Sequence, residues 1–266
     1  MMRALLIGYG KMGHLIAQLA PQYNIAVSSI VDENFDFSSA VLPPQCVGFN
    51  SLTQEAIDLC DIVFDFSHAK DICQRILMLA QAKKPMLVGT TGWEKSETEA
   101  KRIIAQYQST LLCSPNFSLG IALFTRLVHR ASELFSPFPQ YDPAMLEIHH
   151  RQKQDAPSGT AKAIAQKLMC HYPEKKLSFE VSQESALDTS EVHVGSLRVG
   201  SVPGTHEVFF DSHEDQITLC HTARSREGFA RGALQAAYWV IDKNGWYTLD
   251  DMIDEKIHAK PITKKK

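Results

Sequence analysis

The chain has 266 residues, of which 44% are hydrophobic and 21% are charged. This length and composition exclude a short peptide and disorder of the whole chain, and they predict one large or two modest globular domains. Lys and Arg number 27 against 30 Asp and Glu, which gives a net charge of −3. Such a balance provides no basic field for a phosphodiester backbone, so we expect no nucleic-acid partner.

No stretch of the sequence approaches the roughly 18 apolar residues that a membrane span requires. The apolar start at residues 4–7 is followed at once by glycines rather than by a small-residue cleavage site. We therefore expect no membrane association and a cytoplasmic location. The six cysteines are far apart and form no C-x-x-C pair, so they predict buried, reduced thiols rather than zinc ligands or disulfides.

The first half of the chain alternates short apolar runs with segments of helical period, as in βαβ units that build a parallel sheet. Strands are predicted at residues 4–7, 25–31, 62–66, 86–88 and 110–113. Helices are predicted at residues 12–23, from 72 to near 84, and at 97–107.

After Asn116 the pattern changes to that of an α+β insert. A helix from Leu119 is followed by predicted strands at residues 145–148, 192–199, 207–211 and 216–221, with a short helix near Gly159. The closing helix, residues 229–241, is apolar on more than one side, which predicts that it packs on the first domain. We thus expect an α/β protein with a Rossmann domain (1–117 plus 227–266) and an inserted domain on an open mixed sheet (118–226).

A glycine-rich turn follows the first predicted strand and opens the first helix. Its residues, Gly8-Tyr9-Gly10-Lys11-Met12-Gly13, match G-x-G-x-x-G. In this context the first glycine permits a tight turn, the second lets the backbone approach a pyrophosphate, and the third allows close helix packing. The spacing predicts dinucleotide binding, against the alternative that the glycines serve packing alone.

Asp32 lies 19 residues beyond Gly13, at the end of the second predicted strand, where an acid can bind a ribose 2′-hydroxyl. Glu33 follows it, so a 2′-phosphate would meet two carboxylates with no adjacent arginine. This favours NADH over NADPH as the cofactor. Lys11 leaves NADPH open, because its ammonium can reach a phosphate.

Two further loops at predicted strand ends carry small and polar residues: Gly89-Thr90-Thr91-Gly92 and Ser114-Pro115-Asn116-Phe117. Ligands of parallel sheets bind at the carboxyl ends of strands. These loops are therefore candidate cofactor contacts, with simple turns as the alternative.

The segment from Glu147 to Ala161 concentrates groups that can handle an anion and a proton. Gly159 and Thr160 open a predicted helix, whose free N–H groups can hold a carboxylate, and Lys153 supplies a movable cation. His149 or His150 could donate a proton near neutral pH. Adjacent histidines could instead be solvated surface groups. A metal pair is disfavoured, because neighbours on a strand point to opposite faces.

This segment, Glu147-Ile148-His149-His150-x-x-Lys153-x-Asp155-Ala156-Pro157-Ser158-Gly159-Thr160-Ala161, resembles the signature of the dihydrodipicolinate reductases, now called 4-hydroxy-tetrahydrodipicolinate reductases. The resemblance extends along the chain through the glycine turn and the runs 64–67, 88–92, 115–118, 204–206 and 225–226. It implies a substrate domain whose sheet assembles a homotetramer, and NAD(P)H-dependent reduction of a small cyclic dicarboxylate in diaminopimelate and lysine biosynthesis.

By the same resemblance, His149 would be the proton donor and acceptor, Lys153 a second donor and His150 a substrate contact, with Gly159 and Thr160 cradling a carboxylate. The cofactor would contact the glycine turn, Asp32, residues 89–91 and residues 114–117. The chain departs from many members in its shorter glycine turn with Lys11, in Glu33 and in His68. Two rival interpretations stay open: a reductase of another small acid or imine, and a non-catalytic redox sensor that binds NADH.

Overall fold

The computed structural model describes residues 1–39, 41–180 and 186–259. The chain divides into two compact units, Met1–Ser118 with Phe229–Lys266, and Leu119–Gly228. The predicted domain limits near Phe117 and Glu227 fall close to these positions.

The first unit is built on a parallel sheet of seven strands in the order β12-β6-β5-β4-β1-β2-β3. The strands are β1 (Met2–Ile7), β2 (Ile25–Val31), β3 (Val47–Phe49), β4 (Ile62–Asp65), β5 (Met86–Val88), β6 (Thr110–Cys113) and β12 (Gly245–Thr248). The chain runs outward from β1 in one direction and from β4 in the other. The carboxyl ends of these two neighbours therefore form the switch point at which such sheets bind ligands.

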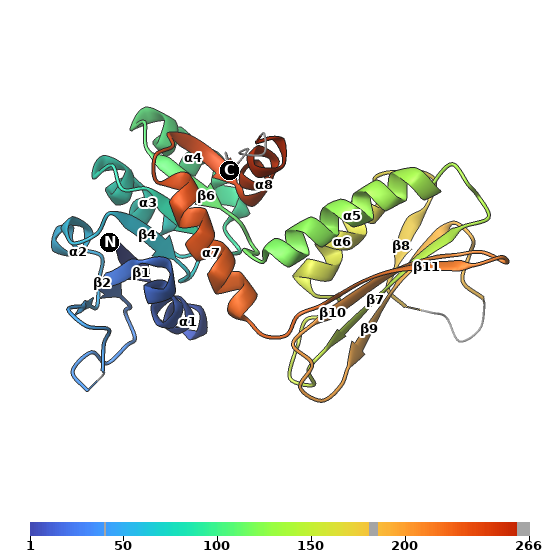
Figure 1. Ribbon diagram of the computed structural model, residues 1–266, viewed down its shortest axis with the longest axis horizontal. Helices are drawn as coiled ribbons and strands as arrows, with labels where there is room; N and C mark the ends of the chain where they lie inside the picture. Colours follow the sequence, from blue (N-terminus) through green and yellow to red (C-terminus); the bar gives the residue numbers. More distant parts are fainter. Residues whose placement is uncertain (40, 181–185, 260–266) are drawn as a thin grey trace, which may run out of the picture. The chain divides into compact units, whose positions relative to one another are not determined.

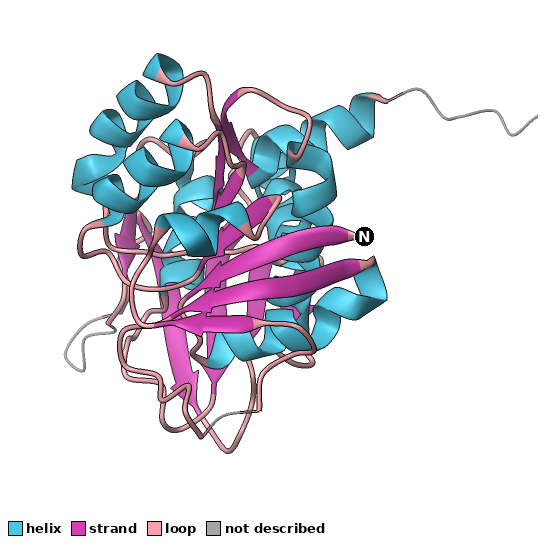
Figure 2. Cartoon of the chain, turned by 90° about the vertical axis from the view of Figure 1, so that its left-hand side faces the viewer, coloured by secondary structure: helices cyan, strands magenta, loops and turns pink. Residues whose placement is uncertain are grey.

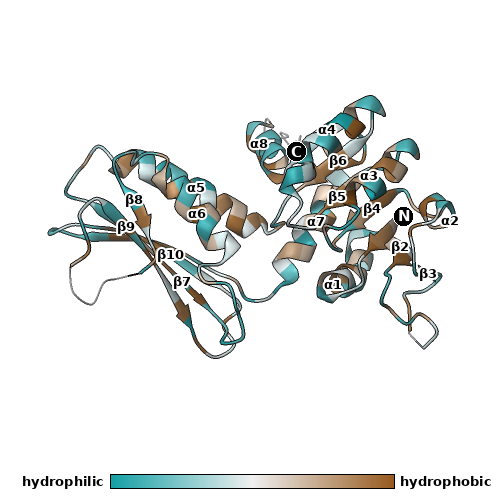
Figure 3. Cartoon of the chain, turned by 180° about the vertical axis from the view of Figure 1, so that it is seen from behind, coloured by the Kyte–Doolittle hydropathy of each residue, from teal (hydrophilic) through white to brown (hydrophobic). Residues whose placement is uncertain are grey.

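Helices cover both faces of this sheet (Figures 1 and 2). They are α1 (Lys11–Leu19), α2 (Gln54–Asp58), α3 (Ile72–Gln81), α4 (Glu97–Gln106), α7 (Glu227–Val240) and α8 (Leu249–His258), with short 3₁₀ turns η1 (Ala20–Tyr23) and η2 (Glu94–Ser96). All four residues of β4 and all three of β5 are buried, as two covered faces require. The hydropathy colouring of Figure 3 shows these strands as hydrophobic.

Several short or terminal elements were missed by the sequence patterns. Residues 12–23 are not one helix, because α1 ends at Leu19 and the chain continues as η1, where Pro21 cannot donate an N–H. β3, α2 and β12 have three to five residues, too few to show a period. The start of α8 could have been predicted, because Thr248 and Asp251 form a reciprocal capping box there.

The second unit is built on a mixed sheet of five strands in the order β11-β10-β7-β9-β8. β7 is antiparallel to β10 and parallel to β9. The strands are β7 (Asp142–His149), β8 (Lys176–Ser178), β9 (Glu191–Arg198), β10 (Thr205–Asp211) and β11 (Gln216–Thr222). Together with the Rossmann-type sheet of the first unit, this confirms the predicted fold class.

Two helices, α5 (Leu119–Phe135) and α6 (Gly159–Met169), cover one face of the mixed sheet (Figure 1). Their apolar residues pack with Met145, Val194 and Phe210 in a common core. Along β7, Met145, Glu147 and His149 are buried, whereas Ala144, Leu146 and Ile148 on the alternate face are only half-buried. The pleat of β7 thus directs one carboxylate and one imidazole to the covered side.

None of the described helices is long and apolar enough to cross a lipid bilayer. All six cysteines are free thiols. The expectation that they are buried is confirmed for Cys60 alone. Cys46, Cys73 and Cys113 are half-buried, and Cys170 and Cys220 are exposed. Cys170 follows the last turn of α6, and Cys220 lies on β11 at the edge of the mixed sheet, where one neighbouring strand is lacking.

Candidate active site

The glycine turn after β1 brings strand, turn and helix into close contact. Gly8 has φ +89°, and a Cβ atom there would lie 2.7 Å from the Phe66 carbonyl oxygen. A Cβ atom at Gly13 would lie 2.2 Å from the Gly8 carbonyl oxygen. At Gly10, by contrast, a Cβ atom would meet no atom within 4 Å. The turn therefore leaves open space at Gly10, beside the N-terminus of α1, where a pyrophosphate can approach.

Asp32 follows β2 and is tied to the glycine turn. Its carboxylate accepts hydrogen bonds from the backbone N–H groups of Tyr9, at 2.7 Å, and Asn34, at 3.0 Å. The Tyr9 ring is buried and stacks on His14, with 3.8 Å between ring centroids. The Tyr9 backbone thus holds Asp32 in place, while the contact of Asp32 with a ribose stays a prediction. Lys11 and Met12 form the first turn of α1.

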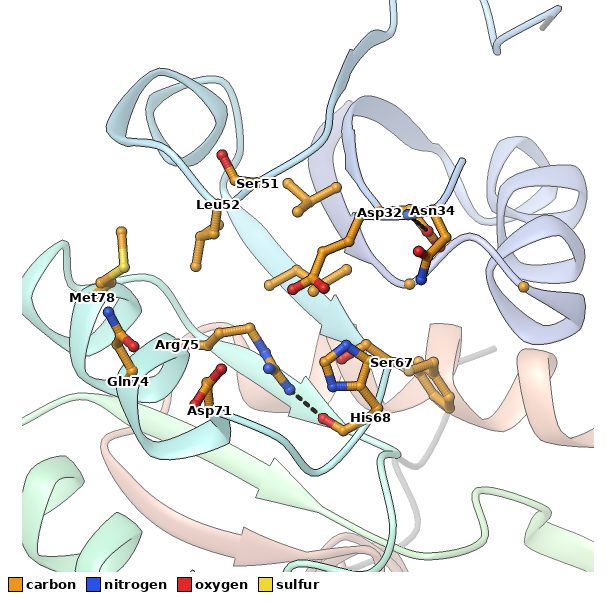
Figure 4. A pocket seen from close by; sticks show the side chains of 16 residues that line it. Asp32, Asn34, Ser51, Leu52, Ser67, His68, Asp71, Gln74, Arg75 and Met78 are labelled. Carbon is orange, nitrogen blue, oxygen red and sulfur yellow. Dashed lines mark hydrogen bonds between the residues drawn. The ribbon is translucent and has the colours of Figure 1, made fainter. Parts of the chain in front are cut away.

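A cavity of about 440 Å³ lies beside this turn, with Gly8, Gly10 and Asp32 in its wall. Figure 4 shows further lining residues that sequence reasoning did not assign to the cofactor: Asn34, Ser51, Leu52, Ser67, His68, Asp71, Gln74, Arg75 and Met78. They come from loops after β2, β3 and β4 and from α3, so no single sequence motif marks them. The carboxylates in this wall can bind the hydroxyl groups of a ribose, and its apolar side chains can contact a base. The open backbone at Gly10 can take a pyrophosphate.

Arg75 lines this cavity, but its donors are engaged within the protein. Its Nε atom donates to Asp65 at 2.8 Å, and its terminal nitrogens donate to the carbonyl oxygens of Lys70 and His68. Asp65 is buried and also accepts hydrogen bonds from the hydroxyl groups of Ser67, at 2.6 Å, and Thr90, at 2.9 Å. The Asp65 carboxylate therefore organises one wall of the cavity and holds the guanidinium against that wall.

The two other predicted cofactor loops lie at the ends of β5 and β6 but are not part of the wall of this cavity. Gly89 packs under the Phe66 ring, and Thr90 bonds to Asp65, whereas Thr91 is exposed. In the second loop, the Ser114 hydroxyl donates to the Asn116 carbonyl oxygen, Pro115 is exposed, and Phe117 is buried against Phe66. Several of these side chains therefore have structural partners, and their role toward a cofactor stays a prediction.

In the second unit, Glu147 is fully buried and is surrounded by donors. Its Oε1 atom accepts hydrogen bonds from Arg198, at 2.8 Å, the Ser196 hydroxyl, at 2.9 Å, and the Ser158 backbone N–H, at 3.1 Å. Burial alone would raise the pKa of this carboxyl, but the hydrogen bonds outweigh burial and leave the pKa below its ordinary value. Glu147 is therefore an ionised carboxylate at neutral pH.

His149 lies two residues further along β7 and is 7% exposed. Its Nδ1 atom is 3.2 Å from Glu147 Oε2, and its Nε2 atom faces Gly204, where an added Cβ would lie 3.0 Å away. Burial lowers the pKa of the imidazole below its ordinary value, although the Glu147 carboxylate opposes this. His150, the next residue, is half-buried just beyond the end of β7.

Lys153 and α6 form an anion site on the loop that follows β7. The Lys153 Nζ atom donates to the Asp155 carboxylate at 2.7 Å. This bond lowers the pKa of the Asp155 carboxyl, and the Gly159 N–H contributes in the same direction. Ser158 caps α6 by accepting from the Ala161 N–H, so Gly159 and Thr160 form its first turn. The predicted groups Lys153 and Gly159 thus act together on one carboxylate.

Glu147, His149 and His206 also meet a distance criterion for metal ligands, because one ligand atom of each lies within 4.8 Å of the others. The Arg198 guanidinium, however, bonds to the same Glu147 carboxylate. A cation in that position opposes the binding of a second, divalent one. The cluster is better suited to holding a proton than a metal ion.

A parallel sheet whose first turn can take a pyrophosphate, followed by a unit with a buried imidazole beside an anion site, defines a dinucleotide-dependent oxidoreductase with a separate substrate domain. The family model "Dihydrodipicolinate reductase, N-terminus" matches residues 2–117, and "Dihydrodipicolinate reductase, C-terminus" matches residues 120–253. The chain belongs to the dihydrodipicolinate reductase family, whose members are NAD(P)H-dependent oxidoreductases of diaminopimelate and lysine biosynthesis.

Individual relatives agree with this assignment over nearly the whole chain. The 4-hydroxy-tetrahydrodipicolinate reductase of Christiangramia forsetii is 31% identical, over 96% of this chain and 98% of the relative. That of Campylobacter hominis is 36% identical, over 94% and 95%. A dipicolinate-bound dihydrodipicolinate reductase from a Paenisporosarcina species has the same fold, with a TM-score of 0.76 and 22% identity over 93% of this chain and 97% of that one.

Proposed function

We propose that the second unit of this reductase binds a small cyclic dicarboxylate, 4-hydroxy-tetrahydrodipicolinate, and that His149 supplies the proton that completes its reduction. The observation that carries the proposal is the pairing of Asp155 with Lys153 and the start of α6. The Asp155 carboxylate already binds the Lys153 ammonium and the N-terminus of α6. A substrate carboxylate would need the same two groups. The relative from Paenisporosarcina, which binds dipicolinate, supports this substrate class.

In this mechanism the 4-hydroxyl group of the substrate first leaves as water, which gives the unsaturated dihydrodipicolinate ring. The dinucleotide, when bound, would supply a hydride to that ring. Lys153, Gly159 and Thr160 hold one carboxylate of the substrate, and His150 contacts it near the end of β7. Hydride addition leaves electron density on the ring, which the His149 imidazolium neutralises by donating a proton. Lys153 is the second candidate donor, because its ammonium lies on the loop that directly follows β7.

Initial rates with enzymatically generated substrate test this function directly. Oxidation of NADH or NADPH should depend on that substrate and should be absent with other small keto acids and cyclic imines. Dipicolinate should inhibit competitively. Nucleotide binding without turnover of this substrate would instead support a redox sensor, and turnover of a different imine would support another reductase.

We also propose that NADH is preferred over NADPH. Asp32, Glu33 and Asp71 bring three carboxylates to the wall of the nucleoside cavity. Arg75 is the one Lys or Arg among the described lining residues, and its donors are engaged by Asp65 and by two carbonyl oxygens. A 2′-phosphate would therefore face negative charge without a free guanidinium.

We expect kcat/KM to be at least about tenfold higher with NADH than with NADPH, because close like charges cost on the order of 1 kcal/mol or more. Glu33→Gln should narrow this ratio by raising kcat/KM for NADPH, while Glu99→Gln, an exposed acid on α4, should leave it unchanged. Lys11→Ala should lower the NADPH rate further. A wild-type preference for NADPH would contradict the proposal.

We propose, finally, that the chain forms a homotetramer through the face of the mixed sheet that lies opposite α5 and α6. Half-buried Leu146 and Ile148 on β7 lie on this face, together with Phe209 on β10 and Leu197, which is 48% exposed. A sheet face that exposes several apolar side chains is stabilised when a second copy of the chain covers it.

Light scattering after size exclusion should therefore give the mass of four chains, and Leu197→Lys should reduce it to that of a smaller species. Leu127→Lys is the matched control, because Leu127 is 60% exposed but lies on α5. A wild-type monomer, or an unchanged tetramer of Leu197→Lys, would count against this face.

A further inference from the structure

The pairing of β7 with its two neighbours gathers four polar side chains around Glu147. His206 on β10 lies directly opposite Glu147, and Ser196 on β9 is its partner on the other side. His149, two residues along β7, has Arg198 as its register partner on β9. Because residues two apart on a strand share a face, Glu147 and His149 lie side by side within the covered layer of the sheet.

The two oxygens of Glu147 have different surroundings. Oε1 accepts from Arg198, Ser196 and the Ser158 backbone, which together fix the orientation of the carboxylate. Oε2 has no hydrogen-bond partner among the described residues, and neither has His149 Nδ1, although the two atoms are 3.2 Å apart. A buried carboxylate oxygen and a buried imidazole nitrogen that lack other partners are each expected to satisfy the other.

We propose that Glu147 is the positioning residue of His149: its Oε2 atom accepts the Nδ1 proton, which leaves Nε2 as the nitrogen that exchanges the proton of the reaction. This inference rests on the proposed role of His149 as proton donor. When the imidazolium donates its Nε2 proton to the substrate, the neutral ring keeps its Nδ1 proton, which stays hydrogen-bonded to Glu147 Oε2. A proton from water then restores Nε2.

Gly204 supports this orientation from the opposite side of the ring. A Cβ atom at Gly204 would lie only 3.0 Å from His149 Nε2, so glycine keeps the space around this nitrogen clear. Glu147 holds one edge of the ring by its Nδ1 atom, while the other edge faces backbone without a side chain. The ring is thereby oriented without any group on Nε2 that would compete with a substrate.

His206 adds a second buried imidazole but not a second positive charge. It packs edge-on against His149, with 5.3 Å between ring centroids, and its Nε2 atom is 4.0 Å from Glu147 Oε2. Burial lowers the pKa of His206 to about 4, and it is therefore neutral at pH 7. The imidazole that becomes a cation beside Glu147 is consequently that of His149.

The charged and titratable groups that act on His149 come from three adjoining elements of the sheet and from the loop after β7. They are Glu147 on β7, Arg198 on β9, His206 on β10, and Lys153 and Asp155 on the loop. Arg198 and Lys153 lower the pKa of His149, and Asp155 and Glu147 raise it, with Glu147 having the larger effect of the two acids. Removing the Glu147 charge therefore lowers the pKa of His149 further.

The tautomer of His149 can be measured in the intact protein. Long-range ¹H–¹⁵N spectra of the full chain, labelled with ¹⁵N-histidine, distinguish Nδ1–H from Nε2–H rings, and the His149→Gln and His206→Gln variants assign the two signals. Above its titration, His149 should be an Nδ1–H tautomer. An Nε2–H ring or an even mixture would overturn the inference without depending on the folding of any Glu147 variant.

A pair of variants provides the functional test. Glu147→Gln should lower kcat by about tenfold or more and should move the alkaline decline of kcat/KM to lower pH by about one unit. Glu207→Gln is the matched control, because Glu207 alternates with His206 on β10 and lies on the other face of the sheet, so its pH profile should stay close to that of the wild type. An unchanged profile in folded Glu147→Gln would contradict the positioning role.

The two proposals fail in different ways. Wild-type turnover of His149→Gln would remove His149 from the mechanism and with it the proposed proton donor. Inactive His149→Gln together with an Nε2–H tautomer in the wild type would instead leave the proposed function intact and overturn only the role of Glu147.

Discussion

Replacement of His149 by glutamine is expected to lower kcat by about 10²- to 10⁴-fold, with only a modest change in KM, because general acid catalysis contributes about that much. Glutamine retains hydrogen-bonding atoms on β7, but its amide has no acidic proton that it could transfer to the substrate. Steady-state kinetics with varied substrate should separate the two constants. His213→Gln is the matched control, because His213 is exposed on the turn between β10 and β11.

The wild-type pH profile gives a second measure of the same residue. Burial lowers the pKa of His149, and the proposed mechanism requires the protonated ring. kcat/KM should therefore decline as pH rises through this lowered pKa, and the decline should disappear in the residual activity of His149→Gln. A variant with wild-type turnover, or with the same alkaline decline, would show that another group donates the proton.

Replacement of Lys153 by alanine is expected to lower kcat and raise KM, with a combined loss of about 10²- to 10³-fold in kcat/KM. The variant would remove the proposed charge-assisted bond to the substrate carboxylate, and it frees the Asp155 carboxylate beside the start of α6. That carboxylate would then repel the dianionic substrate. The effect on both constants distinguishes Lys153 from His149, whose loss should fall mainly on kcat.

Lys167→Ala provides the control, since Lys167 is exposed on the last turn of α6, away from its N-terminus. The double variant Lys153→Ala with Asp155→Ala should recover part of the lost affinity, because it also removes the repelling carboxylate. A Lys153→Ala protein with an unchanged KM would mean that the substrate carboxylate is held elsewhere.

Much of the first unit could be predicted because its signals are local in the chain. The turn at Gly8–Gly13 is set by steric contacts over a few residues, and Asp32 is placed by the length of one helix and one strand. The same holds for the start of α6, where Ser158 caps a helix within three residues. The long strands β1 and β2 were found for a similar reason, since both are apolar over most of their length.

The surroundings of His149 could not be predicted from local signals in the sequence. Glu147 receives its fixed orientation from Ser196 and Arg198, 49 and 51 residues away, and His206 reaches it only through the register of β10. The sequence likewise did not indicate that Arg75 lines the cavity and is held there by Asp65. These contacts depend on which strands are neighbours and on their register, and both are settled by packing across the whole sheet rather than by residues close in sequence.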